Sequence, residues 1–263
     1  MFIDHELELM NNELITEGKF AYKSSGEGRP LIVLHGLMGG LSNFDELFDY
    51  FPKHNYRVII PALPIYDLPI LKTNIKNLAI FLKEFYDYIG CSSAILIGNS
   101  LGGHLALMFQ KLYPEKVAGL VLTGSSGLYE NAMGASYPKR GDYEYMKAKA
   151  EGVFYDPKTA TKEIVDEVYN TVNDRNRAIR IIAFAKSAIR HNMAKDLPNM
   201  NIPVGLIWGK QDSVTPPEVA EDFHKLLPQS NLYWIDKCGH AAMMEQPTLF
   251  NEIAHNWLKE NNL

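Results

Sequence analysis

Cysteine is scarce in this sequence, where Cys91 and Cys238 are the only two among 263 residues. Two cysteines make no disulfide framework of the kind that holds small secreted domains together. The stability of the protein must therefore come from a packed core. A chain of this length can bury a substantial core, and one α/β domain can account for all of it.

Long hydrophobic runs and a strong excess of positive charge are also missing. No apolar run is long enough to span a bilayer, and acidic residues such as Asp4, Glu6 and Glu8 interrupt the region where a signal peptide would be apolar. The formal net charge is -5 at pH 7, from 26 basic and 31 acidic residues. This balance of charge does not indicate binding to nucleic acid or to an anionic membrane. We expect a cytoplasmic, soluble protein whose partner is a small-molecule substrate.

What the sequence does contain is a regular alternation of short apolar runs and helical patterns, typical of βαβ units and a mostly parallel sheet. The apolar runs are continuous in Val, Ile and Leu, as in strands buried on both faces. An earlier, more alternating pair, at about 3–9 and 14–24, predicts an antiparallel edge hairpin that turns at Asn11-Asn12. The predicted strands are 30–35, 56–63, 93–98, 118–124, 204–209 and 231–236, and the predicted helices are 43–53, 74–89, 101–113, 216–227 and 247–260.

One stretch, residues 125–198, has no strand-like run. Apolar residues recur there at helical spacing, first at Ile164, Val168 and Val172 and then at Ile181, Ala185 and Ile189. We interpret this stretch as a helical insertion that follows the sixth strand. The predicted core of the protein then consists of residues 1–124 and 199–263.

The segment ILIGNSLGGHLAL, residues 95–107, places a serine in an abrupt turn from strand to helix. Gly98, Ser100 and Gly102 match the pattern G-x-S-x-G of a nucleophile elbow, in which a strained turn exposes a serine hydroxyl above the sheet. The flanking positions must be small because a side chain there would collide with the neighbouring strand or helix. Ser100 is therefore the candidate nucleophile, with Asn99 inside the elbow.

A serine hydroxyl needs a base, and the base needs an orienting acid. In a sheet of this kind the acid and the base should follow later strands, in that order. Asp212 follows the run at 204–209, and His240 follows the run at 231–236 in a loop where glycine directly precedes it. Asp236 is the rival acid, which we rank below Asp212 because it ends the strand that leads to His240.

Hydrolysis through a serine also requires donors for the oxyanion that forms at the carbonyl oxygen. The residue after the nucleophile, Leu101, supplies one backbone N–H group. The loop that follows the run LIVLHG supplies the other, and we choose Leu37 for it, with Met38 as the alternative.

With these residues identified, the chain resembles the α/β-hydrolase family over nearly its whole length. The segments that carry the resemblance are LIVLHG, ILIGNSLGGHLAL, VGLIWGKQD, IDKCGHAAMMEQP and FNEIAHNWL. The resemblance implies a central sheet of about eight strands flanked by helices and a catalytic triad of Ser100, Asp212 and His240. It also implies a helical lid formed by residues 125–198, no metal and no organic cofactor.

Within the family, the sequence GNSLGGH and the late CGH resemble the meta-cleavage carbon–carbon bond hydrolases. Two features depart from that group. Its members typically carry tryptophan after the histidine, where this chain has Ala241. Their lid arginine has no certain counterpart among the candidates Arg175, Arg177, Arg180 and Arg190.

The function that these residues predict first is hydrolysis of a small carboxylic ester by a Ser-His-Asp acyl-enzyme mechanism. A carbon–carbon bond hydrolase or another acyl hydrolase of the same fold is the alternative. A third possibility is a ligand receptor that retains the triad and signals through its lid. The first two classes turn over many substrate molecules, whereas a receptor does not.

Overall fold

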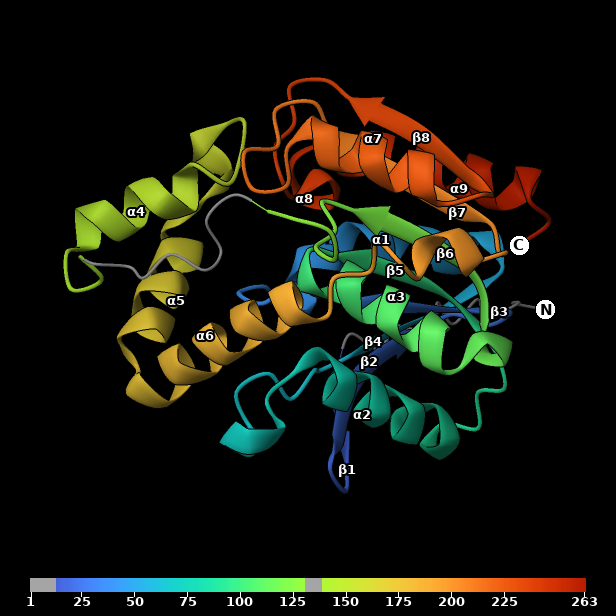
Figure 1. Cartoon of the computed structure of the whole chain (residues 1–263), viewed down its shortest axis with the longest axis horizontal. Helices are drawn as coiled ribbons and strands as arrows, with labels where there is room; N and C mark the ends of the chain where they lie inside the picture. The colour runs from blue at the N-terminus through green and yellow to red at the C-terminus, as the bar shows by residue number, and fades with distance from the viewer. Residues whose placement is uncertain (1–12, 131–138) are drawn as a thin grey trace, which may run out of the picture.

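The computed structural model describes residues 13–130 and 139–263 and contains one sheet of eight strands (Figure 1). The strand order is β1-β2-β4-β3-β5-β6-β7-β8. β1 pairs antiparallel with β2 and β2 antiparallel with β4, and all other neighbours are parallel. The strands are β1 (Ile15–Glu17), β2 (Phe20–Ser25), β3 (Arg29–Leu34), β4 (Tyr56–Pro61), β5 (Ala94–Asn99), β6 (Val117–Thr123), β7 (Val204–Gly209) and β8 (Ser230–Ile235).

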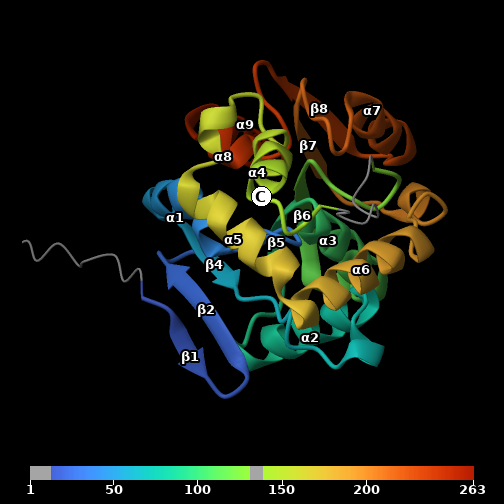
Figure 2. The same ribbon diagram turned by 90° about the vertical axis from the view of Figure 1, so that its left-hand side faces the viewer.

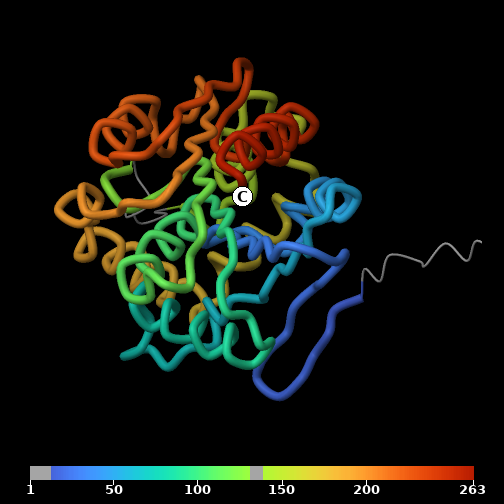
Figure 3. Tube along the Cα trace, turned by 90° about the vertical axis from the view of Figure 1, so that its right-hand side faces the viewer, coloured from blue at the N-terminus to red at the C-terminus, as the bar shows by residue number. Residues whose placement is uncertain are grey.

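Helices cover both faces of the sheet, which explains why its central strands are apolar throughout. Along β3, Ile32 and Leu34 belong to one hydrophobic cluster, whereas Leu31 and Val33 belong to another on the opposite face. Figure 3 shows the two helical layers on either side of the sheet. The first layer holds α2 (Ile75–Tyr88), α3 (Leu101–Leu112) and α7 (Pro217–Leu226), and the second holds α1 (Asp45–Tyr50), α8 (Ala242–Glu245) and α9 (Pro247–Glu260).

Three further helices lie in the chain between β6 and β7: α4 (Tyr143–Glu151), α5 (Lys162–Asn173) and α6 (Arg175–Arg190). They gather at one end of the molecule, as Figures 1 and 2 show. Each begins at a side-chain cap, because the N-cap residues Asp142, Thr161 and Asp174 accept a hydrogen bond from a backbone N–H in the first turn. Short 3₁₀ turns complete the described elements: η1 (Leu41–Phe44), η2 (Phe51–His54), η3 (Ile70–Lys72), η4 (Pro114–Lys116), η5 (Pro157–Thr159) and η6 (Leu197–Asn199).

The α/β class and the mostly parallel sheet of eight strands are confirmed. The six strands predicted from apolar runs agree with β3–β8 to within two residues. The helix predicted at 43–53 is broken into η1, α1 and η2. The division into a core and a lid at residue 125 stays a prediction.

An antiparallel hairpin does lie at the sheet edge, but its position was wrongly predicted. Residues 14–24 do not form one strand, because the chain turns within them at Gly18 and Lys19. Glu17 pairs with Phe20 across this two-residue loop, and Gly18 has a φ of 59°, a left-handed conformation that glycine adopts without strain. The other half of the prediction, at 3–9 with its turn at Asn11-Asn12, lies outside the described residues.

Candidate active site

The strand-to-helix corner has the geometry that its glycine spacing predicts. β5 ends at Asn99 and α3 begins at Leu101, so that Ser100 alone makes the turn. Its φ of 54° and ψ of -120° lie where a residue with a Cβ atom is strained. A Cβ atom on Gly102 would lie 2.0 Å from the carbonyl oxygen of Leu34, so only glycine lets the helix approach β3 this closely.

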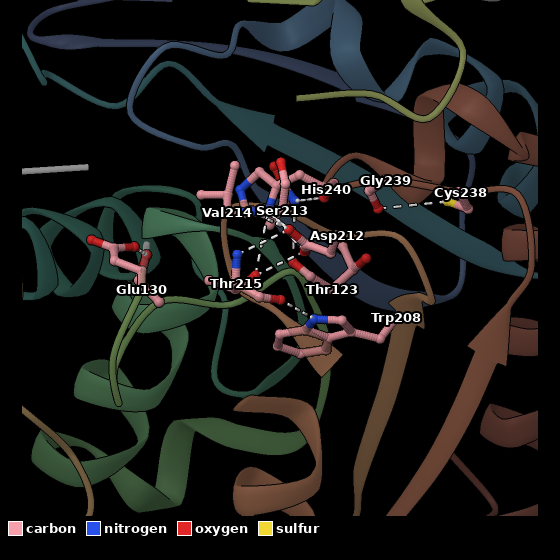
Figure 4. Close-up of polar contacts among 12 residues, drawn as sticks. Thr123, Glu130, Trp208, Asp212, Ser213, Val214, Thr215, Cys238, Gly239 and His240 are labelled. Atoms are coloured by element: carbon pink, nitrogen blue, oxygen red, sulfur yellow. Dashed lines mark hydrogen bonds and ion pairs between the residues drawn. The ribbon is translucent and has the colours of Figure 1, made fainter. Parts of the chain in front are cut away.

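Asp212 and His240 meet at the carboxyl ends of β7 and β8 (Figure 4). The Nδ1 atom of His240 donates to the Asp212 carboxylate, with distances of 2.9 Å to Oδ2 and 3.2 Å to Oδ1. Both side chains are buried. The rival acid, Asp236, is exposed and accepts a hydrogen bond from Gln211 instead. The structure therefore pairs the histidine with the acid that the strand order favours.

The Asp212 carboxylate is held by hydrogen-bond donors that were not predicted from the sequence. Its Oδ1 accepts from the backbone N–H groups of Val214 (2.8 Å) and Thr215 (2.9 Å), and its Oδ2 accepts from the Thr215 hydroxyl at 2.8 Å. The indole N–H of Trp208 in turn donates to the Thr215 carbonyl at 2.8 Å. An aspartate side chain in a turn often accepts from the backbone N–H groups two and three residues later, and this local pattern could have indicated these donors.

Burial and charge act in opposite directions on His240. Burial is the largest single influence and lowers the pKa of the imidazole, but the Asp212 charge and hydrogen bond raise it, and the more distant Glu130 raises it further. Together the carboxylates prevail, so the pKa of His240 lies above the usual value of 6.5. The paired carboxylate thus favours the protonated ring that a serine hydrolase forms during reaction.

Asn99 joins the elbow to the histidine loop. Its side-chain amide donates to the carbonyl oxygens of Thr123 and His240, each at 3.1 Å. Asn99, which lies inside the elbow, is therefore held by both the β6 end and the histidine loop. Because the amide holds the His240 backbone, it also fixes the distance between the two loops.

Ser100 and His240 border the same pocket, whose wall includes residues of α4 and α5. The Ser100 hydroxyl has no hydrogen-bond partner among the described residues, although its atom is buried. It is therefore available to a reacting group. Most lining side chains are apolar: Leu37, Met38, Met146, Ala150, Val153, Phe154, Ile164, Val168, Val214, Ala241 and Met244. The charged side chains in this lining are Lys149 and Glu167.

The expected oxyanion donors lie at this pocket only in part. Leu37 and Met38 both line it. Leu101 directly follows Ser100 in the chain and is the first residue of α3. Its backbone N–H therefore has no acceptor within the helix. The assignment of Leu37 and Leu101 as the donors stays a prediction.

None of the four candidate arginines lines the pocket. The guanidinium of Arg177 stacks on the ring of Tyr66 at 5.2 Å, and that of Arg180 donates to the carbonyl of Leu68 at 3.0 Å. Arg175 and Arg190 are exposed at the two ends of α6. The single cation in the lining of this pocket, among the described residues, is Lys149.

His104, one turn beyond Ser100, is a packed residue. Its Nε2 lies 2.9 Å from the carbonyl oxygen of His191, and burial lowers its pKa to about 4. Elsewhere in residues 13–130 and 139–263, no group of three or more His, Cys, Asp or Glu side chains is arranged to hold a metal ion. No helix of the same described ranges is long and apolar enough to cross a membrane.

A fold and a site of this kind define an α/β hydrolase, and comparison with known proteins agrees. The family model described as the alpha/beta hydrolase family matches residues 31–253, and the chain belongs to this family. A solved structure with 54% identity and a TM-score of 0.80 covers 95% of this chain and 100% of its own. It is an alpha/beta hydrolase enzyme from the metagenome of sediments of the Mar Chica lagoon, Morocco.

Curated relatives include hydrolases of carbon–carbon bonds. A 2-hydroxy-6-oxononadienedioate/2-hydroxy-6-oxononatrienedioate hydrolase from Pseudomonas sp is 28% identical over 92% of each chain. A 2-hydroxy-6-oxo-6-phenylhexa-2,4-dienoate hydrolase from Comamonas testosteroni is 25% identical over 91% of each. The meta-cleavage product hydrolase of Pseudomonas fluorescens IP01, at 20% identity with a TM-score of 0.78 over 92% of this chain and 94% of its own, shares the fold. The resemblance to this group that the motifs indicated is confirmed.

Proposed function

We propose that the protein hydrolyses small carboxylic esters by transferring their acyl group to Ser100 and then to water. The observation that carries the proposal is the pairing of His240 with Asp212 beside a pocket that Ser100 also borders. Since Nδ1 of His240 donates to Asp212, the other ring nitrogen, Nε2, is the one left to accept a proton from the serine hydroxyl.

The reaction follows from these positions. As the Ser100 oxygen attacks the carbonyl carbon, its proton passes to Nε2 of His240, and the N–H groups of Leu37 and Leu101 stabilise the oxyanion. When the intermediate collapses, the alkoxide leaves with that proton and the acyl group stays on Ser100. Water then attacks the acyl-enzyme while His240 takes a proton from it, and His240 returns this proton to the Ser100 oxygen as the carboxylic acid leaves.

The apolar lining supports an uncharged acyl group of modest length as the substrate. Met146, Val168 and Phe154 belong to the segment between β6 and β7 and supply apolar surface to the pocket that Ser100 borders. We therefore regard this segment, predicted as residues 125–198, as the lid that sets chain-length preference. Each methylene that meets an apolar wall contributes about 0.8 kcal/mol, roughly fourfold in binding.

Cleavage of a carbon–carbon bond next to a ketone is the second candidate, and the names of the curated relatives favour it over ester cleavage. The same triad can perform such a reaction. Two features of this chain speak for the ester instead. The pocket has Ala241 where the meta-cleavage group carries tryptophan, and no arginine of the described residues lines it.

A panel of substrates separates the candidates. We expect kcat/KM for nitrophenyl esters of short acids to exceed that for a 2-hydroxy-6-oxo-dienoate by at least tenfold. The opposite order would assign the carbon–carbon reaction. A fluorophosphonate reagent that labels the wild type at Ser100, detected by mass spectrometry, tests the nucleophile independently. Labelling without multiple turnovers of any substrate would indicate a receptor rather than an enzyme.

A further inference from the structure

Exposed apolar side chains gather on the part of the surface formed by α6, η3 and the first half of α2. Large hydrophobic residues are rarely left in water without a reason when they are contiguous. Leu71 of η3 is 93% exposed and Ile189 of α6 is 71% exposed. Of the eleven large hydrophobic side chains exposed in the described structure, six belong to these elements: Ile70, Leu71, Ile80, Ile179, Ile182 and Ile189.

α6 is apolar on two sides. Its inner side packs on the protein through Ile181, Phe184 and Ala185, which are buried. Its outer side carries a second stripe whose members are spaced alternately by four and three residues, so they share one side of the helix. This outer stripe consists of Arg175, Ile179, Ile182, Lys186 and Ile189. Ile189 shares its helical spacing with the buried Ile181 and Ala185, yet it is exposed.

A surface groove borders the C-terminal end of α6, and its lining includes both apolar and cationic side chains. It lies between the end of α6 and the start of α2, and its lining includes Leu71, Lys76, Ile80 and Arg190. The two helices are fastened together there, because the backbone N–H of Ile75 donates to the Ser187 hydroxyl at 3.0 Å. Figures 1 and 2 show α6 beside α2, with η3 next to both. The groove therefore brings Leu71 and Ile80 beside Arg190, the residue that follows Ile189 of the outer stripe.

The same surface is cationic. The sequence of α6 contains Arg and Lys residues and no acidic residue. None of its exposed cations forms a salt bridge with a described residue. The nearest acidic side chains along the chain are those of Asp67, Glu84, Asp174 and Asp196. Asp174 caps α6, whereas Glu84 and Asp196 form salt bridges with Lys19 and Lys111. The exposed cation Arg177 of α6 stacks on Tyr66, and the other exposed cations of these elements are Lys72, Lys76, Arg175, Lys186 and Arg190.

We propose that this surface, which we name the α6 face, docks on anionic phospholipid. The α6 face consists of the six exposed apolar side chains and the five exposed cations other than Arg177 given above. Isoleucine and leucine enter the boundary of the acyl chains while lysine and arginine contact lipid phosphates, the pattern of helices that lie in a membrane interface. A second copy of the chain is a poorer partner, because a symmetric contact would bring the cations of two α6 helices together.

The net charge of -5 conceals this feature, and for that reason the composition predicted no membrane partner. Salt screens charges beyond about 10 Å, so a local group of cations acts on a nearby surface more strongly than distant carboxylates do. The proposal concerns peripheral binding and does not depend on which acyl substrate the enzyme cleaves.

Sedimentation with vesicles tests the proposal on the full chain. We expect the protein to bind vesicles of phosphatidylcholine mixed with phosphatidylglycerol, to bind pure phosphatidylcholine much less, and to be released as salt is raised. Equal binding to both vesicle types, or binding to neither, would overturn the proposal.

Paired variants locate the surface. Lys186→Gln with Arg190→Gln should weaken binding about 25-fold, at roughly fivefold for each cation near an anionic surface. Ile182→Gln with Ile189→Gln should weaken it at least tenfold. The matched control is Leu249→Gln with Lys259→Gln on α9, which removes one exposed apolar residue and one exposed cation elsewhere and should change binding less than twofold.

All these variants should retain the wild-type rate on a soluble ester, because none of the substituted residues borders the pocket with Ser100. A control as damaging as the α6 variants would overturn the assignment of the surface. Light scattering measures the oligomeric state of the wild type and of the isoleucine variant. If the wild type is a dimer that the two isoleucine substitutions dissociate, the α6 face belongs to a second copy and the lipid proposal is wrong.

Discussion

The backbone N–H of His240 donates a 3.0 Å hydrogen bond to the backbone carbonyl of Val153. This bond ties the loop of the proposed base to the segment after α4 that lines the pocket. Glu245 reinforces the tie, because its carboxylate accepts from the N–H groups of Gly239 (2.5 Å), Tyr155 (2.7 Å) and Asp156 (3.0 Å). The pocket wall and the histidine loop are therefore held as one unit.

Glu245→Gln should loosen this unit. A glutamine side chain has one acceptor oxygen in place of two, so it cannot serve the N–H groups on both sides. We expect a loss of about 1–3 kcal/mol in the free energy of unfolding. KM for esters that fill the pocket should rise several-fold more than KM for the smallest ester, as measured by steady-state kinetics. Glu252→Gln, exposed on α9, is the control, and equal effects of the two changes would count against the interpretation.

Ser100→Ala should abolish ester hydrolysis and leave the fold intact. Removal of a nucleophile of this type lowers kcat by about 10⁴–10⁶. The Ser100 hydroxyl makes no hydrogen bond to a described residue, so its loss should move the melting temperature little. The exposed Ser92→Ala is the matched control. Residual activity above a tenth of the wild type would show that another group is the nucleophile.

Asp212→Asn should lower kcat by about 10⁴, because an amide no longer holds His240 in the correct tautomer or stabilises its charged form. Asp236→Asn provides the comparison with the rival acid on the same pair of loops. Since Asp236 is exposed and bonded to Gln211, its change should cost less than a factor of three. The choice of acid is wrong if Asp236→Asn is the more damaging of the two.

Activity should rise with pH along an ascending limb whose midpoint lies above 6.5. A base works only when neutral, and the Asp212 and Glu130 charges outweigh burial and raise the pKa of His240. Activity is therefore lost as pH falls through that raised value. Glu130→Gln removes one raising charge and should move the midpoint down. A profile of kcat/KM that is flat between pH 5 and 8 would exclude a histidine base.

Gly102→Ala should destabilise the protein by about 3 kcal/mol or more, because the added Cβ would collide with the Leu34 carbonyl at 2.0 Å and force α3 away from β3. Gly141→Ala is a clean control, since nothing lies within 4 Å of a Cβ there. Urea denaturation of both variants measures the difference. Similar midpoints would mean that the elbow tolerates the methyl group.

Local sequence determined the central sheet and the positions from which its chemistry comes. Continuous apolar runs predicted strands β3–β7 because strands buried on both faces leave no room for polar alternation, and the apolar centre of β8 was enough to predict that edge strand as well. The sequence also predicted the elbow at Ser100 and the roles of Asp212 and His240 from their positions after strands. Each follows a strand directly, and the carboxyl ends of parallel strands meet at one edge of the sheet.

Tertiary structure alone decided what joins these positions together. The contacts of Glu245 with Gly239 and Tyr155, and of Asn99 with the His240 carbonyl, connect residues far apart in the chain, so no local pattern indicates them. The same holds for Ile189, whose spacing is that of a core residue. Periodicity shows which residues share a side of a helix, but only packing decides whether that side meets the protein or the solvent.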